Sequence, residues 1–248
     1  MDIGSELMAS LEIETVFSIT VAGHKIPVTE SVVVSWAVMA LLIAGALVLT
    51  RNLQRIPKGA QTLLEAGVEF LNGFSKQQFG SCAKIFGPYI GTIFMFLLVA
   101  NILPAITPVY ALGIRPAFEI KPPAKDINVC AALATITAAL LLLSGLIARG
   151  PAGWGKKLLQ PVPLMLPFNL LEYVIRPLSL CLRLFGNILG GFIIMSLISI
   201  ALAGAIKFSM IVPLPFSLYF DFFDGFVQAL VFTFLTTLYV SEAVHTGE

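Results

Sequence analysis

The sequence predicts an all-α, polytopic integral membrane protein, with about five to six membrane helices and a long tilted helical hairpin in its C-terminal half. Apolar residues make up 58% of the 248 residues and charged residues only 12%, about half the charged share of a typical soluble domain. Mean hydropathy is +0.94. A membrane helix needs roughly 20 mostly apolar residues. Windows without a charged residue cover 31–50, 85–114, 127–148, 184–206 and 225–241.

In chain order, residues 1–30 are expected to form an extramembrane segment, and residues 31–248 a single helical membrane domain. Helices are expected because lipid offers no hydrogen-bond partners to exposed backbone groups. Between the first two spans, residues 61–80 predict a short interfacial helix, with an ordinary connector as an equal alternative. Membrane spans are predicted at about 31–50, 88–111 and 127–148, and the tracts at about 164–207 and 210–241 are long enough to form a tilted hairpin over 164–241.

Basic loops predict the orientation of the chain in the membrane. Loops 51–58 and 149–157 are rich in Arg and Lys and are expected to face the cytoplasm. The N-terminus then lies outside and the C-terminus inside. The second loop contains GPAGWGKK, which resembles a phosphate-binding loop, but Lys157 stands where that motif needs Ser or Thr. We therefore expect a basic turn and no nucleotide site.

Charge and composition exclude several other classes. The net charge of +1 provides no basic surface for nucleic acid. The histidines, His24 and His245, lie near opposite ends of the chain, and the three cysteines are scattered, so the sequence predicts no metal-ligand set, no cofactor and no catalytic triad. The protein is predicted not to be an enzyme.

The last two apolar tracts contain ionisable residues, which are costly in a membrane and commonly line polar paths. At about 100° per residue, the first tract places its polar residues on one helix face, and the second tract does the same. Each of these charges also has a purely structural explanation, and both explanations remain open. Arg183 pairs with an aspartate and only fixes helix packing. Arg176 and Glu172 extend to the cytoplasmic surface. The polar residues are Glu172, Arg176, Ser179, Arg183 and Asn187 in the first tract, and Asp221, Asp224 and Gln228 in the second.

Several separated segments resemble subunit a of the F-type ATP synthase, the stator subunit of its membrane sector. The resemblance covers about residues 30–243, and its most specific segment is PLSLCLRLFGN, from Pro177 to Asn187. The other segments, in order, are PYIGTIFMFLLVANILP (88–104), PPAKDIN (122–128), PFNLLEYVIRP (167–177) and VQALVFTFLTTLYVSEA (227–243).

The resemblance implies a non-catalytic subunit that forms two offset half-channels against a rotating ring of c subunits. Its other implied partners are b-type peripheral stalk subunits and the rest of the ATP synthase. Arg183 matches the family's obligatory arginine, and Asn187 and Gln228 match polar neighbours of that arginine. A permanent cation there keeps the passing ring carboxylate ionised and blocks leakage between the half-channels.

Helix direction then assigns the acids to the two paths. Glu172 belongs to the cytoplasmic path, and Asp221 and Asp224 belong to the external one. Asp126 and Asn128 lie near the external entrance, although a helix cap explains them equally well. One departure is Phe192, because many relatives have a carboxylate or histidine nine residues after the arginine.

Two other function classes remain open. A stand-alone channel or secondary transporter is the first, and the lack of inverted repeats disfavours it. A membrane hydrolase is the second, and the lack of a nucleophile–base pair disfavours it. A bacterial plasma membrane is the expected location, with the thylakoid membrane as the alternative. Whether the ion is H⁺ or Na⁺ does not follow from this chain.

Overall fold

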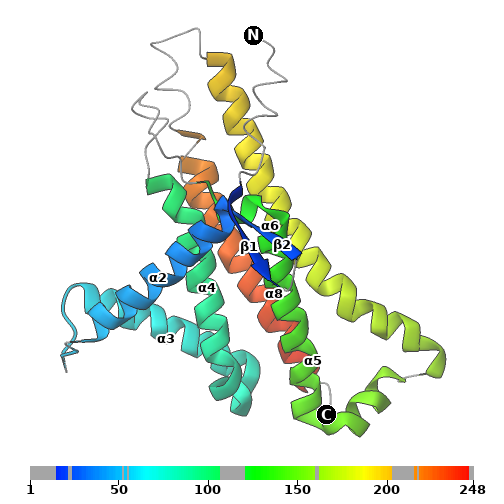
Figure 1. Ribbon diagram of the computed structural model, residues 1–248. Coiled ribbons are helices and arrows are strands. Elements are labelled where there is room, and N and C mark those ends of the chain that lie inside the picture. The colour runs from blue at the N-terminus through cyan, green and yellow to red at the C-terminus, as the bar shows by residue number, and fades with distance from the viewer. Residues whose placement is uncertain are drawn as a thin grey trace. The chain divides into compact units, whose positions relative to one another are not determined.

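The computed structural model describes residues 15–21, 24–51, 53–54, 56–106, 121–159, 162–202, 215–216 and 218–245 (Figure 1). Within these residues five helices are long and apolar enough to cross a membrane, which confirms the predicted all-α, multi-pass fold class. The chain divides into two compact units. Unit 1 contains residues 1–42, 96–129 and 184–229, and unit 2 contains residues 43–95, 130–183 and 230–248.

The described part of unit 1 begins with a β-hairpin, which is not predicted from the sequence. Strands β1 (Thr15–Val21) and β2 (His24–Thr29) pair antiparallel, with Ile19 opposite Ile26. The residues of β1 are largely β-branched or aromatic, which suits an extended, half-exposed backbone. Outside the membrane such a hairpin meets no hydrogen-bonding restriction, so it is compatible with the predicted extramembrane segment.

Helix α2 (Glu30–Thr50) follows β2 directly and forms the first predicted span. Its N-terminal half packs on the C-terminal half of α4 (Ala83–Ile106) in unit 1. Val34, Val38 and Ala100 form the buried cluster between them. Helix α4 begins five residues before the predicted start at 88, because the 3-10 turn η1 (Gly80–Cys82) leads straight into it; the predicted end at 111 lies outside the described residues.

Unit 2 is built around α3 (Ala60–Phe79), the first half of α4 and the end of α8 (Gly225–His245). The predicted helix after the first span is therefore present. It also packs into the protein: Phe79, Phe86 and Val240 are members of one buried cluster. The hydroxyl of Ser241 donates a 2.7 Å hydrogen bond to the carbonyl of Gln78, which ties α8 to the end of α3.

Helix α5 (Ile127–Leu158) extends ten residues beyond the predicted span. Gly150 has φ 70° and ψ 167°, so the helix is broken there and restarts at Pro151. This corrects the predicted basic turn, because Pro151 stands at the first position of a helix, where its missing N–H has no cost. Trp154, in this restarted helix, donates a hydrogen bond from Nε1 to the Tyr173 hydroxyl at 3.2 Å.

The long C-terminal tracts form helix α6 (Leu166–Leu202) and helix α8. Helix α6 continues through Pro177, whereas the residues between 203 and 214 lie outside the described part of the chain. Before α8, residues Leu218–Asp224 form the π-helix η4, which the sequence analysis does not predict. Because a π-helix has i→i+5 hydrogen bonds, α-helical spacing cannot be used to place its side chains.

A tight contact at the start of α8 yields a stability prediction. A Cβ on Gly225 would lie 2.9 Å from the Cβ of buried Asn101, whose Nδ2 donates to the Gly225 carbonyl. We expect Gly225→Ala to cost about 1–3 kcal/mol in overpacking, offset by about 1 kcal/mol of helix propensity. The thermal aggregation midpoint of the detergent-solubilised protein should therefore fall. The control is Gly67→Ala in α3, which meets nothing within 4 Å; an equal rise for both variants would contradict the contact.

Candidate functional site

One face of α6 combines a cation with small residues. Arg183 is exposed, and Asn187, one turn further on, is exposed as well. A Cβ at Gly186 or at Gly190 would meet nothing within 4 Å, whereas one at Gly191 would lie 3.2 Å from the Phe220 ring. The face with Arg183 is thus open beside Gly186 and Gly190, and Gly191 on another face packs inside unit 1.

The guanidinium of Arg183 makes no ion pair or side-chain hydrogen bond with any of the residues that the structure describes. The alternative in which Arg183 pairs with an aspartate therefore finds no support among the described side chains. An arginine keeps its charge in a protein, so this face of α6 presents a permanent cation.

Asn187 and Gln228 are brought together in unit 1. The Nδ2 of Asn187 donates a 2.8 Å hydrogen bond to Oε1 of Gln228. Gln228 is 2% exposed, and its Nε2 is buried without a protein partner among the described residues. Both residues are predicted to lie on polar helix faces, and the structure adds the direct bond between them. A buried amide N–H without a partner is costly, so Gln228 is only partly satisfied by its bond to Asn187.

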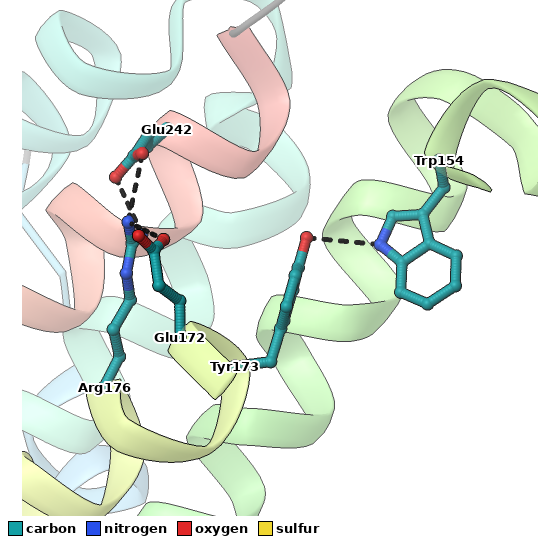
Figure 2. Close-up of polar contacts among 5 residues, drawn as sticks. All are labelled: Trp154, Glu172, Tyr173, Arg176 and Glu242. Atoms are coloured by element: carbon teal, nitrogen blue, oxygen red, sulfur yellow. Dashed lines mark hydrogen bonds and ion pairs between the residues drawn. The ribbon is translucent and has the colours of Figure 1, made fainter. Parts of the chain in front are cut away.

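Glu172 and Arg176 lie in unit 2, together with an acid that the sequence analysis missed (Figure 2). Arg176 Nη2 lies 2.7 Å from Glu172 Oε2, and its Nη1 lies 2.7 Å from Oε2 of Glu242. The Nη2 atom also reaches Glu242 Oε1 at 3.1 Å, so the contact with α8 is bidentate. The signal for Glu242 in the sequence is weak: it is a single carboxylate at the end of the last apolar tract, where charged residues are ordinary.

The two aspartates that are predicted for the external path lie in η4. The backbone of Asp221 is described but its side chain is not, so its predicted direction lies outside the described atoms. Asp224 ends η4, is partly buried, and makes no ion pair with another described residue. Because η4 has i→i+5 hydrogen bonds, the spacing of about 100° per residue that places Asp221 and Asp224 on one face with Gln228 does not apply within it.

Asp126 forms a helix cap. Its Oδ1 accepts hydrogen bonds from the backbone N–H and the Nδ2 of Asn128, both at 2.9 Å, at the start of α5. Its Oδ2 accepts a 3.0 Å hydrogen bond from the hydroxyl of Thr29, the last residue of β2. Asp126 is fully buried. Of the two readings of Asp126 and Asn128, this geometry favours the cap, which also ties the hairpin to α5.

Phe192 has an unexpected neighbour. The ammonium of Lys125, in the 3-10 turn η2 (Pro123–Lys125), lies 3.7 Å from the centre of the Phe192 ring. Lys125 is 4% exposed. The ring face is electron-rich, so a desolvated ammonium above it is stabilised. A lysine and a phenylalanine therefore meet at the position where the family resemblance leads one to expect a carboxylate or histidine.

Together these residues describe a multi-pass membrane protein whose helix α6 has an open arginine face, with carboxylates on the same helix and on α8. The chain matches the ATP synthase A chain family over residues 32–241. Because the match covers most of the chain, the protein belongs to that family and to the membrane sector of ATP synthase. Its members form the ion-translocating membrane part of the complex.

The Asn187–Gln228 bond predicts energetic coupling between the two side chains. Asn187→Ala leaves the buried Oε1 of Gln228 without its donor, which we expect to cost about 1–3 kcal/mol. Gln228→Ala removes the same bond, so the double variant should lose less stability than the two single variants together. Thermal aggregation midpoints of the four proteins test this. Asn72→Ala, an exposed amide in α3, serves as the control; strict additivity would show that the bond contributes nothing.

Proposed function

We propose that the chain forms two half-channels against a ring of c subunits and couples ion flow through them to ATP synthesis. It acts as a stator and makes or breaks no covalent bond itself. The observation that supports this most directly is the exposed guanidinium of Arg183, on a helix face where Gly186 and Gly190 have open space beside them. Small residues let another helix approach closely, so a ring helix fits against this face.

The chemistry of Arg183 suits the proposed task. A carboxylate on the ring has its ionised form favoured when an opposite charge lies within a few ångströms. The guanidinium cannot be deprotonated, so it cannot pass a proton on. A ring carboxylate facing Arg183 therefore releases its ion, and the cation blocks direct passage between the half-channels.

The acids divide between two paths. Glu172 lies 11 residues before Arg183 on α6, which is about 16 Å along a straight helix, and we assign it to the cytoplasmic path. Asp221 and Asp224 precede Gln228 and belong to the external path. We keep Asp126 and Asn128 near the external entrance as the residues that fix the start of α5.

Proton transport, with sodium as the alternative, agrees with all of these groups, because carboxylates serve either ion. The proposed partners are the c-ring and b-type stalk subunits, in a bacterial plasma membrane. A stand-alone channel or transporter is the alternative function. Purification in mild detergent separates the two: the proposed subunit comes out with a ring and a peripheral ATPase, and a transporter comes out alone.

Arg183 provides the decisive test. Arg183→Ala should abolish ATP synthesis driven by an ion gradient in membrane vesicles, while ATP hydrolysis by the peripheral sector persists. Arg183→Lys should also be poor, because an ammonium can lose its proton when desolvated and lacks the planar fork. Exposed Arg51, beyond the first span, is the matched control, and Arg51→Ala should behave as wild type. Normal synthesis in Arg183→Ala vesicles would refute the proposed function.

The external path can be tested through Asp221 and Phe192. Asp221→Asn should impair ATP synthesis, with Asp224 sustaining part of the rate. Adding Phe192→Glu should restore little by itself, because Lys125 would pair with the new carboxylate. Adding Lys125→Met as well should free that carboxylate and restore more. The same vesicle assay, with Lys125→Met alone as control, tests this order; full activity in the Asp221→Asn/Asp224→Asn double variant would place the external path elsewhere.

A further inference from the structure

We propose that Glu242 is a further acid of the cytoplasmic ion path, and that Arg176 is the positioning residue that holds Glu242 beside Glu172. This inference rests on the proposed function, since it adds a residue to one of its two paths. The ligand is the transported monovalent cation, a proton or a sodium ion, attracted to a carboxylate pair at the mouth of the path.

The geometry joins both acids to one guanidinium. Arg176 contacts Glu242 through both of its terminal nitrogens and contacts Glu172 through one of them (Figure 2). The ring of Tyr239 lies below the guanidinium, with its centre 5.1 Å from Cζ. A planar fork is needed to reach two carboxylates and stack on a ring at once. Arg176 therefore fixes the distance between an acid on α6 and an acid on α8.

Exposure differs between the cation and the acids. The side chain of Arg176 is 22% exposed, whereas Glu172 is 58% exposed and Glu242 is 43% exposed. The carboxylates therefore face outward, with the guanidinium more covered behind them. At the aqueous mouth that we propose, ion pairs that are exposed to water contribute only about 0–1 kcal/mol to stability. Stabilisation of the fold is therefore a weak reason for this arrangement.

The charge of the cluster favours cations. Two carboxylates and one guanidinium have a formal net charge of −1, and no other charged residue stands in α8 between Gly225 and Ser241. A cluster with a net negative charge next to apolar helices attracts cations to its surface. The three side chains therefore form an anionic mouth of the proposed path. The positive charge of Arg176 offsets the repulsion between the two carboxylates.

The backbone on both sides of the cluster is held in place. Tyr173, next to Glu172, accepts a hydrogen bond from Trp154 and stacks edge-on against its ring (Figure 2). Ser241, next to Glu242, is bonded to Gln78 in α3. The two acids thus stand on a supported frame, which is what a path needs if its carboxylates must keep a constant separation.

The experiment compares Glu242→Gln, Glu242→Asp and Arg176→Lys in the assembled complex. Glutamine still accepts a hydrogen bond from Arg176 but has no charge, so the chain should assemble and the membranes should keep their ATPase. ATP synthesis driven by an ion gradient should fall about tenfold, the low end of what charge focusing contributes. Aspartate restores the charge and should regain most of the rate, and Arg176→Lys should be intermediate because one ammonium holds the two acids less firmly.

Glu69→Gln is the matched control, since it removes an exposed carboxylate of α3 that lies outside the cluster, and it should leave synthesis unchanged. Full synthesis in Glu242→Gln overturns the inference. A second outcome also overturns it: synthesis falls together with the amount of assembled complex in Glu242→Gln and is not regained in Glu242→Asp. The cluster then only holds the two helices together. Arg183→Ala separates the two proposals: if it abolishes synthesis while Glu242→Gln is normal, only this inference fails.

Discussion

An arginine cannot discharge inside a membrane helix, and helix α6 must accommodate two of them. The structure meets this constraint in different ways at the two sites. Arg176 is surrounded by two carboxylates and an aromatic ring, so its charge is satisfied within unit 2. Arg183 is exposed, with no such partner among the described side chains. The cost of this second charge is the physical basis of the proposal that a carboxylate of the ring faces Arg183.

The Gln228 side chain on α8 has only part of its hydrogen-bonding capacity filled. The amide of Gln228 accepts a bond from Asn187 and keeps a buried N–H without a protein partner among the described residues. An amide side chain carries no charge and does not transfer an ion, but it can orient water and a neighbouring guanidinium. The carboxylates lie elsewhere, at Glu172 on α6 and in the π-helix η4 that precedes α8. In the proposed function these carboxylates transfer the ion, and the amides only orient water and the guanidinium.

Much of the fold could be predicted from the chain because hydrophobic length is a local property. The five spans, the helix at α3 and the polar face of α6 all follow from runs of residues read in order. The β-hairpin, the π-helix η4 and the break at Gly150 were missed. The backbone conformation of each depends on contacts with other segments. One such contact is the hydrogen bond from Thr29 to Asp126, which ties the hairpin to the start of α5. The Lys125–Phe192 pair was missed because its two residues lie far apart in the chain.

The sequence by itself determined that this protein crosses a membrane several times, that Arg183 is its least expected charge, and that it resembles subunit a of the F-type ATP synthase. Composition and motif order are sufficient for these conclusions, because membrane insertion depends on apolar length and the motifs are contiguous. Only the tertiary structure decided which charges are paired. Glu242 and Arg176 are 66 residues apart, and no pattern in the chain indicates that they meet. Pairing depends on how two helices lie side by side, which is a matter of packing between distant segments.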